Sequence, residues 1–397
     1  MRLSKKKHYR NYFHENSKNM NIAGEISNDP TKIANGLNDF YSTVAENLQG
    51  SIRSNGTDFT KYLKDPNEKT FHFESADCQE ILLLINSLSD NKASGPNSIP
   101  TEILKLLKNC ICIPLTHIIN LSFATGIYPS KLKEAKVIPI FKNKGNPLNT
   151  PNYRPISLLS NLDKIFEKIV HKRMYSFLDK YNCIYELQFG FRAKHSTSHA
   201  LISLMEKVRE ALDYPGSKFA CGVFIDLQKA FDTVDHSILL KKLEHYGIRG
   251  IANSWFKSYL SDRKQFTTVN GFNSDYKTMK YGVPQGSVLG PLLFLIYIND
   301  LHNAIKNSTV HHFADDTNLL VSGLNIKKIQ DLINLDLKYL SNWLKANKIA
   351  LNSSKTELII FRQRNKHISY RKNSGDKLEP WKLNIKIDGK KLNLPPM

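Results

Sequence analysis

Residues 308–321 have the sequence Ser308-Thr-Val-His-His-Phe-Ala-Asp-Asp-Thr-Asn-Leu-Leu-Val321. Before the adjacent acids Asp315 and Asp316, the residues Val310, His312 and Ala314 alternate with Thr309, His311 and Phe313. A short apolar run, 319–321, follows the acids. Two short β-prone runs joined by an acidic pair predict a β-hairpin with Asp315 and Asp316 at its bend. Such a pair is ordinary in a turn, because Asp bonds the local backbone. Adjacent carboxylates also repel each other, which raises one pKa unless a cation lies between them.

A third carboxylate follows a strand-like segment upstream. The segment Phe219-Ala-Cys-Gly-Val-Phe-Ile225 is uncharged, mostly apolar and without proline, and it ends at Asp226. It predicts a buried strand with Asp226 at its exit. The alternative is that Asp226 caps a following helix with apolar positions at Ala230, Phe231 and Val234. A strand-end Asp and a hairpin pair can bring three oxygen donors together, which suits Mg²⁺. Two such ions about 3.5–4 Å apart serve phosphoryl transfer.

The composition indicates a partner of opposite charge. The chain has 397 residues, enough for two or three domains and a sizeable core, and 41% of them are hydrophobic. The charge is unusual, because 56 Lys and Arg against 36 Asp and Glu give a formal net charge of +20. Such an excess favours a polyanionic partner, most simply nucleic acid. A basic but unspecialised surface is the alternative.

Cysteine usage and the lengths of apolar runs bear on the compartment. The cysteine count is odd and its spacing fits no zinc pattern, so we expect reduced thiols, with Cys110 and Cys112 buried. Residues 1–10 are basic but lack the apolar core of a signal peptide. The longest apolar stretch, 288–298, is too short to span a bilayer. We therefore expect an intracellular protein, in the nucleus, the cytoplasm or both, without a membrane partner.

The first half of the chain carries a basic loop between two β-prone segments. We expect a loose arm over residues 1–30 and an amphipathic helix over 30–50, where apolar residues recur at helical spacing. The predicted strand 135–141 runs into a basic loop that begins at Lys142, and Arg154 follows. Lys offers a point charge and Arg a bidentate fork, so the two could clamp a triphosphate. A solvated charged loop is the alternative.

Three segments after residue 187 are rich in turn signals. Gln188-Phe-Gly-Phe-Arg-Ala-Lys-His-Ser-Thr197 precedes an amphipathic helix, and its last residues suit an N-cap. Gly282-Val-Pro-Gln-Gly286 is a Gly-rich turn before a helix, where a backbone can approach a base or sugar closely. Residues 349–361 predict a turn with Lys355 that enters a strand.

Five motifs follow one another along the chain. They are Tyr153-Arg-Pro-Ile-Ser157, Asp226 with Phe231 five residues later, Gly282-Val-Pro-Gln-Gly286, Phe313-Ala-Asp-Asp316 and Lys355. In this order and with these separations, the chain resembles the reverse transcriptase domain of LINE-type non-LTR retrotransposons of the jockey-like kind. The resemblance covers roughly residues 75–390. Each motif is common by itself, whereas five in register are specific.

The resemblance implies an α+β chain with a right-hand polymerase fold, in which fingers and a palm with an antiparallel sheet are present and the thumb is largely missing. It implies four segments. They are a basic N-terminal extension with one amphipathic helix (1–70), fingers (71–215), palm (216–365), and a basic tail that starts the primer-grip region (366–397). The family continues into a primer grip and a helical thumb, and full elements carry an endonuclease upstream. We therefore expect a piece of an element's second reading frame.

The resemblance also implies a catalytic centre. Asp226, Asp315 and Asp316 would be palm carboxylates that hold two Mg²⁺ ions, with Mn²⁺ as an alternative ion. One ion would lower the pKa of the primer 3′-hydroxyl, and the other would neutralise the leaving pyrophosphate. Lys355 would donate a proton to pyrophosphate; a solvated turn lysine is the alternative.

The remaining motifs would meet the incoming dNTP. Lys142 and Arg154 would bind its triphosphate, while Gln285 and Gly286 would line the base and template side. Phe231 would lie under the sugar and exclude a 2′-hydroxyl; a core phenylalanine on a helix is the alternative. The implied partners are an RNA template, a DNA primer and dNTPs.

Two departures from the family keep a second function open. The family usually has Asp after Lys92-Ala-Ser-Gly-Pro, and this chain has Asn97 there. The chain also stops about where the primer grip should begin. One hypothesis is an RNA-directed DNA polymerase, and the other is a non-catalytic remnant that binds nucleic acid. An RNA-dependent RNA polymerase is disfavoured, because an enzyme that makes RNA needs room for the 2′-hydroxyl where Phe231 stands.

Overall fold

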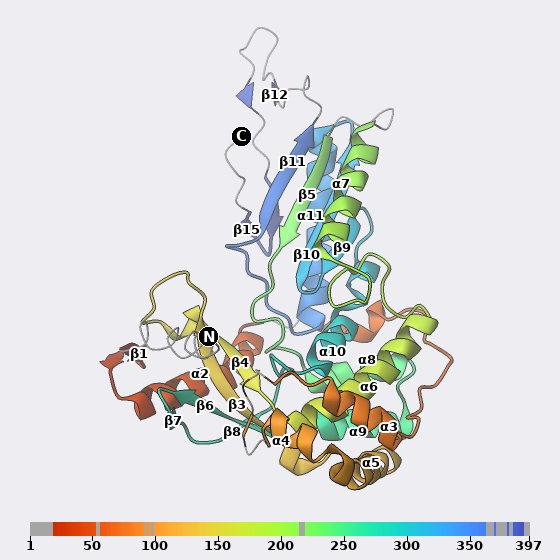
Figure 1. Cartoon of the computed structure of the whole chain (residues 1–397). Helices are drawn as coiled ribbons and strands as arrows, with labels where there is room; N and C mark the ends of the chain where they lie inside the picture. Colours follow the sequence, from red (N-terminus) through yellow and green to blue (C-terminus); the bar gives the residue numbers. More distant parts are fainter. Residues whose placement is uncertain are drawn as a thin grey trace, which may run out of the picture. The chain divides into compact units, whose positions relative to one another are not determined.

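The computed structural model describes residues 19–52, 56–90, 93, 95–96, 99–213, 219–362, 369–370, 379–380 and 384–392. Within these residues the chain divides into two compact units, each assembled from three stretches. Unit 1 comprises residues up to 48, 66–183 and 231–294, and unit 2 comprises 49–65, 184–230 and the residues from 295 onward. Both units mix helices with strands (Figure 1), which confirms a mixed α and β chain.

Unit 1 is built on a five-stranded sheet. Its strands are β3 (Glu134–Phe141), β4 (Tyr153–Leu158), β6 (Arg263–Val269), β7 (Phe272–Asn273) and β8 (Lys277–Met279). The order is β4-β3-β6-β7, and β8 also pairs with β6. β3 is antiparallel to β4 and parallel to β6. The β6–β7 turn consists of Asn270 and Gly271, both with positive φ, as an Asn-Gly hairpin turn requires.

Unit 1 also holds most of the helices of the chain. They are α2 (Pro30–Ser51), α3 (Cys78–Asn86), α4 (Thr101–Leu106), α5 (Lys108–Thr125), α6 (Asn161–Lys180), α8 (His236–His245), α9 (Gly250–Leu260) and α10 (Leu289–Ile298), with 3₁₀ turns η2 (Ser130–Leu132) and η3 (Thr150–Asn152). The ends of α2 and α10 belong to unit 2. α10 is apolar on all sides and is buried along almost its whole length, as a helix of this composition must be.

Unit 2 is built on a four-stranded antiparallel sheet. Its strands are β5 (Phe219–Ile225), β9 (Thr309–Phe313), β10 (Asp316–Gly323) and β11 (Glu357–Arg362), in the order β11-β5-β10-β9. The other elements are η1 (Phe59–Tyr62), α7 (Thr197–Asp213), η4 (Leu301–Ala304), α11 (Ile326–Ala346), and the two-residue strands β12 (Ser369–Tyr370), β13 (Glu379–Pro380), β14 (Lys386–Ile387) and β15 (Lys390–Lys391).

The strand predicted over residues 219–225 is confirmed as β5, an inner strand of this sheet. All its residues except Phe224 are buried, because both neighbours of the strand and the helices that pack on the sheet exclude water. Leu204 and Val208 of α7 pack on Ala220 of β5 and Leu320 of β10. A continuous apolar run thus forms the middle of the sheet and places Asp226 where the chain leaves it.

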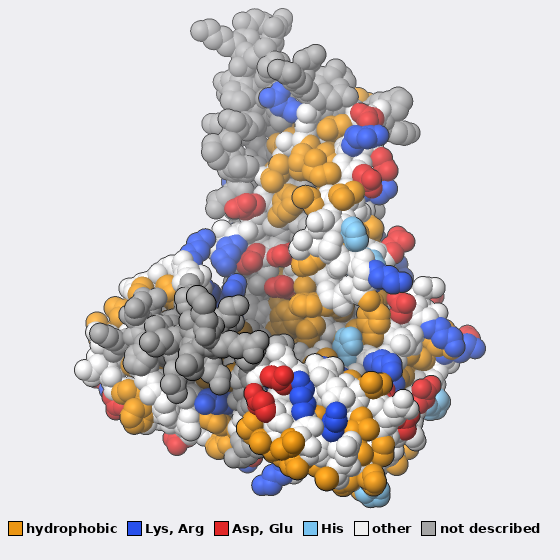
Figure 2. Space-filling view, in the orientation of Figure 1, with side chains coloured by type: hydrophobic (Ala, Val, Ile, Leu, Met, Phe, Trp, Pro, Cys, Tyr) orange, Lys and Arg blue, Asp and Glu red, His pale blue; other side chains and the backbone are white. Residues whose placement is uncertain are grey.

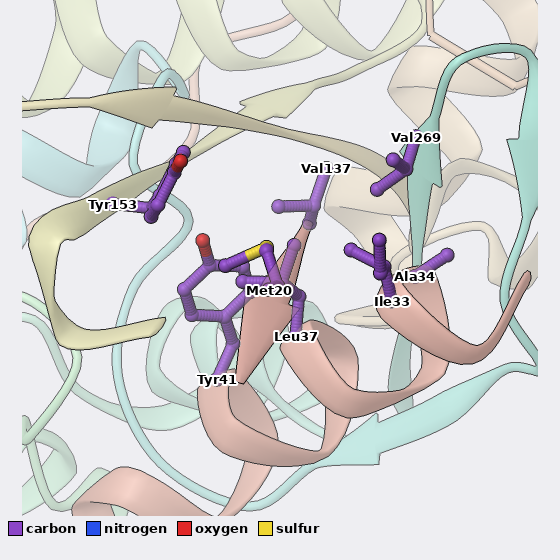
Figure 3. Packing of buried hydrophobic residues seen from close by; sticks show 8 residues of the cluster. All are labelled: Met20, Ile33, Ala34, Leu37, Tyr41, Val137, Tyr153 and Val269. Carbon is purple, nitrogen blue, oxygen red and sulfur yellow. The ribbon is translucent and has the colours of Figure 1, made fainter. Parts of the chain in front are cut away.

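Residues 19–27 are not the loose arm that was predicted for 1–30. Two short strands, β1 (Met20–Ile22) and β2 (Glu25–Ser27), form a hairpin across a turn at Ala23 and Gly24. Met20 is completely buried in a cluster that includes Ile33 of α2 and Tyr153 of β4 (Figure 3). The composition of residues 19–27 did not indicate a hairpin, because the hairpin depends on one buried methionine and a two-residue turn rather than on an apolar run. Residues 1–18 lie outside the described residues.

The predicted segment boundaries stay a prediction. They treat fingers and palm as consecutive stretches of chain, whereas each compact unit takes up three separate stretches. Lys92 and Asn97 lie outside the described residues, as does most of the tail over 366–397.

All five cysteines are free thiols, as expected, but Cys110 is exposed and only its neighbour Cys112 is buried. Among the described residues, we find no helix that has both the length and the apolar character needed to cross a membrane.

Candidate active site

Two carboxylates flank the last residue pair of one ladder in the unit 2 sheet. β5 ends at Ile225, which pairs with Thr317 of β10. Asp226 directly follows Ile225, and Asp316, the first residue of β10, directly precedes Thr317. The two acids therefore lie at the same end of two adjacent strands, and the charge of Asp226 acts on Asp316. The side chain of Asp226 is 35% exposed, so it leaves the buried sheet beside a second acid and within reach of solvent.

The hairpin that was predicted around the acidic pair is confirmed, with one correction. β9 and β10 are joined by the two-residue turn Ala314-Asp315. Asp316 pairs with Phe313 and already belongs to β10, so the prediction that both acids lie at the bend is wrong for Asp316. The reason is that Ala314 takes up the first turn position, with a φ of 57° in the left-handed region that such tight turns need.

Like charges act on one another at this end of the sheet. The pKa of Asp316 is raised, mainly because its carboxyl group is partly desolvated, and further because Asp315 and Asp226 repel its charge. Asp315 and Asp226 are therefore both within electrostatic reach of Asp316. A cation bound among them would relieve this repulsion and favour the ionised forms.

The turn that precedes β11 supplies the remaining contacts of Asp226. Asn352 Nδ2 donates a hydrogen bond to Asp226 Oδ2 at 2.7 Å, and Lys355 Nζ lies 3.9 Å from the same oxygen. The backbone is joined as well, because the Asn352 N–H donates to the Asp226 carbonyl at 2.9 Å. Lys355 is 62% exposed, so its ammonium group is hydrated and contributes little to stability. The structure thus places the predicted Lys355 beside Asp226.

The alternative role of Asp226 as a helix cap is wrong. Residues 228–233 form turns, and the helix predicted through Ala230 and Val234 is absent. The next helix, α8, begins at His236, and its N-cap is Asp235, which accepts the N–H groups of two residues of its first turn. A side chain one residue away from a helix competes better for its N–H groups than one that is ten residues away.

The donor set fits Mg²⁺. This ion prefers carboxylate oxygens, takes one or two of them from a protein, and completes its shell with water and substrate phosphates. In the part of the chain that the structure describes, no group of three or more His, Cys, Asp or Glu side chains is arranged to hold a metal ion. The structure therefore offers Asp226 and Asp316 at the same end of two adjacent strands, with Asp315 next to Asp316, rather than a closed site made of side chains alone.

In unit 1, Gly282-Val-Pro-Gln-Gly286 is fixed to β4. The Gln285 carbonyl accepts the N–H of Ser157 at 2.7 Å, and its side chain donates to Asp232 Oδ1 at 2.6 Å. Gly286 has a φ of 128°, and a Cβ on it would lie 2.5 Å from the Ser157 carbonyl oxygen. Only glycine permits this approach, so the loop has one conformation in which Gly286 is exposed and Gln285 half-buried.

Lys142 and Arg154 belong to the β3–β4 hairpin of the same unit. Arg154 is exposed and pairs with Ile140 of β3. Lys142 follows β3 two residues after Ile140, so the pleat directs both basic side chains to one face of the hairpin. Lys142 Nζ donates to the Pro151 carbonyl at 2.7 Å. The register thus puts both residues on the same face of the hairpin, and their contact with a triphosphate stays a prediction.

Phe231 lies in a turn of unit 1 and not on a helix. Its half-buried ring stacks on Phe294 of α10, with 4.6 Å between the ring centroids and 24° between the planes. Its carbonyl accepts the N–H of Val283 at 2.9 Å, which ties it to the Gly-rich loop. The ring is therefore held in place by packing and by the backbone, and its contact with a sugar stays a prediction.

Two polar residues contact the acidic segment of unit 2 without a sequence signal of their own. Asn352 holds Asp226, and Gln188 binds the backbone of Ala314. The place of Asn352, three residues before Lys355 in one turn, could have indicated it. The contact of Gln188 joins residues 126 positions apart, and no local pattern reveals it.

Comparison with known proteins gives one consistent answer. The family described as reverse transcriptase (RNA-dependent DNA polymerase) matches residues 141–387. The chain is 30% identical over 315 residues to the RNA-directed DNA polymerase from mobile element jockey of Drosophila melanogaster, an alignment that covers 77% of this chain and 34% of that protein. It is 31% identical over 301 residues to the probable RNA-directed DNA polymerase from transposon X-element of the same species, covering 73% and 32%.

A more distant relative is the retrovirus-related Pol polyprotein from type-1 retrotransposable element R1 of Bradysia coprophila. It is 26% identical over 274 residues, which are 68% of this chain and 26% of the relative. The chain thus spans about a third of the length of the jockey and X-element polymerases.

Proposed function

Because this chain belongs to the reverse transcriptase family, we propose that it is the fingers and palm of an RNA-directed DNA polymerase from a LINE-type, jockey-like mobile element. The observation that carries the proposal is that Asp226 and Asp316 lie at the same end of the adjacent strands β5 and β10, within electrostatic reach of each other, with Asp315 in the adjoining turn. This is an arrangement in which carboxylates can share divalent ions with a substrate phosphate.

The carboxylates would act as ligands of two Mg²⁺ ions. Bound there, the ions would lower the pKa of the primer 3′-hydroxyl and neutralise charge on the leaving pyrophosphate. Asp226 and Asp316 would bind from the two strands and Asp315 from the turn. Asn352 would orient the Asp226 carboxylate through the bond to Oδ2. Lys355, which holds a proton at Nζ near the same carboxylate, would release it to pyrophosphate.

The residues of unit 1 would bind the incoming dNTP. Lys142 and Arg154 present two cations on one face of the β3–β4 hairpin and would bind the triphosphate. Gln285 and Gly286 would line the base and template side, where the glycine leaves room for close approach. Phe231 would lie against the sugar and leave no space for a 2′-hydroxyl.

The partners would be an RNA template and a DNA primer inside the cell, in the nucleus, the cytoplasm or both. The net charge of +20 supports a polyanionic partner of this kind, because neutralised phosphates release their counterions on binding.

Primer extension on an RNA template tests the proposal. The reaction contains the purified chain, dNTPs and Mg²⁺, and it is compared with the double variant Asp315→Ala, Asp316→Ala. We expect extension by the wild type and a loss of at least about 1,000-fold in the double variant, because removal of metal ligands leaves the reacting groups without charge stabilisation. Asp331→Ala, at an exposed position of α11, is the matched control and should be fully active.

Two results would contradict the proposal. Equal extension by the double variant would show that the acids are not the ligands. A wild type that binds RNA but never extends a primer would indicate the non-catalytic remnant instead.

A further inference from the structure

The segment 185–192 of unit 2, here called the clamp segment, lies along the edge strand β9. The Tyr185 hydroxyl donates to the Val310 carbonyl at 3.1 Å. Two backbone hydrogen bonds follow, from His312 N–H to the Leu187 carbonyl at 2.9 Å and from Phe189 N–H to the His312 carbonyl at 2.8 Å. The clamp segment thus extends the sheet beyond β9, up to the turn that carries Asp315.

Gln188 binds the backbone of this turn. Its Oε1 accepts the N–H of Ala314 at 3.0 Å, and its Nε2 lies 3.5 Å from the Ala314 carbonyl oxygen. The same Oε1 accepts the N–H of Gly190 at 2.8 Å. Gln188 is only 3% exposed, so water does not compete for these bonds. Both polar backbone groups of the residue before Asp315 are therefore held by one buried side chain.

Gly190 presses on the same turn. A Cβ at Gly190 would lie 2.1 Å from the Ala314 nitrogen and 2.8 Å from its Cα, so no other residue fits without moving the turn. Ala314 itself is a non-glycine residue in the left-handed region, a conformation that persists only where its surroundings enforce it. Gln188 and Gly190 supply that enforcement from one side, by hydrogen bond and by contact.

The clamp segment is itself braced from behind. Arg192 Nη1 lies 3.2 Å from the Tyr185 carbonyl oxygen, 3.4 Å from that of Glu186 and 3.3 Å from that of Gln188. One guanidinium group thus contacts three carbonyl oxygens of the clamp segment, including that of Gln188, and stabilises the conformation of the segment beside β9.

We propose that Gln188 and Gly190 are positioning residues, which fix the turn Ala314-Asp315 so that Asp315 and Asp316 are held as metal ligands before the metal binds. This inference rests on the proposed function. The two residues touch no reacting atom; they act through the backbone of Ala314. A turn that is fixed in advance loses less conformational entropy when it binds an ion, and the ion therefore binds more tightly.

Two variants separate the hydrogen bonds from the contact. Gln188→Met keeps the size of the side chain and removes its bonds, and Gly190→Ala pushes the turn away. Gln79→Met, at an exposed position, and Gly50→Ala, where an added Cβ would meet nothing within 4 Å, are the matched controls. All four proteins are compared with the wild type by hydrogen exchange of the Ala314 N–H and by Mn²⁺ binding, followed by electron paramagnetic resonance.

We expect the Ala314 N–H to exchange at least about tenfold faster in Gln188→Met, because the acceptor that Gln188 supplies is lost. Mn²⁺ should bind about tenfold more weakly in both variants, and it should also bind more weakly in Asp315→Ala, Asp316→Ala, while the controls match the wild type. In primer extension, the Mg²⁺ concentration for half the maximal rate should rise by a similar factor, and the KM for dNTP should not change.

Unchanged exchange at Ala314 in Gln188→Met would overturn the contact itself. Faster exchange with unchanged Mn²⁺ binding in both variants would overturn the positioning role. Both readouts are independent of activity, so a wild type that fails to extend a primer would refute the proposed function without deciding this inference. Should Gly190→Ala fail to fold, Gln188→Met still decides the outcome, because it keeps a side chain of similar size and adds no atom against the turn.

Discussion

At the scale of a residue, Phe231 has the clearest predicted phenotype. Its ring is fixed on Phe294 and would leave no room for a 2′-hydroxyl. We expect Phe231→Ala to raise the preference for rNTPs over dNTPs by about tenfold or more, because removal of a steric block in a pocket changes selectivity by this order. Phe231→Tyr keeps the ring and is the control. Single-nucleotide incorporation with each substrate measures the ratio, and an unchanged ratio in Phe231→Ala would mean that another residue selects the sugar.

Residue by residue, the sequence indicates the side chains whose signals are local. Asp226 could be predicted because an apolar run of strand length stops there, and Asp315 because it stands between two β-prone runs. Asn352 and Gln188 could not be, since each is defined by a hydrogen bond to a segment that is more than 120 residues away. An amide that binds backbone looks like any other polar loop residue until the fold brings its partner to it.

At the scale of elements, the same limit explains the wrong predictions. Ala230, Phe231 and Val234 have helical spacing but form no helix, because the backbone of Phe231 binds the loop at Val283. A tertiary contact here overrides a weak local preference. The buried strand β5 is predicted correctly, since its apolar run has few alternatives to the middle of a sheet.

A buried carboxylate joins helix α6 to the start of α10, and it makes the stability of unit 1 depend on pH. Glu167 accepts the Tyr259 hydroxyl and the Val288 N–H, each at 2.5 Å. Burial, and then repulsion by Asp163, raises the pKa of Glu167 from 4.5 to about 8. Because the pKa of Glu167 is higher in the folded state than in the unfolded state, the protonated carboxyl group contributes to the free energy of unfolding. This contribution is complete below about pH 4.5 and is lost as the pH rises through about 8.

The free energy of unfolding should therefore fall by roughly 1 kcal/mol per pH unit as the pH rises from about 6.5 to about 8, since one proton is released on unfolding there. Urea denaturation at several pH values measures this slope. Glu167→Gln cannot titrate and should show a flatter profile above pH 6.5. Parallel profiles for the two proteins would mean that Glu167 is already ionised in the folded state. The buried His312, whose pKa is lowered to about 3 mainly by burial, acts only at lower pH.

At the scale of the whole molecule, the net positive charge of the chain, rather than one continuous basic patch, indicates a nucleic-acid partner. On the face shown in Figure 2, Lys and Arg side chains (blue) are scattered among acidic ones (red) and do not merge into one field. The net charge of +20 is nevertheless large for 397 residues. Dispersed cations bind a phosphate backbone without reading its sequence, and each neutralised phosphate lowers the log–log slope of affinity against salt by about 0.7 to 0.9.

We therefore expect the affinity for an RNA–DNA hybrid to fall steeply with salt, with a log–log slope of about −4 or steeper if five or more phosphates are neutralised. Fluorescence anisotropy between about 50 and 200 mM salt measures it. The Asp315→Ala, Asp316→Ala variant should keep the slope, because it loses metal ligands and no cation. This separates binding from chemistry: a steep slope with no extension describes a folded binder that does not catalyse. A slope near zero would exclude nucleic acid as the partner that the charge selects, and with it both functions considered for this chain.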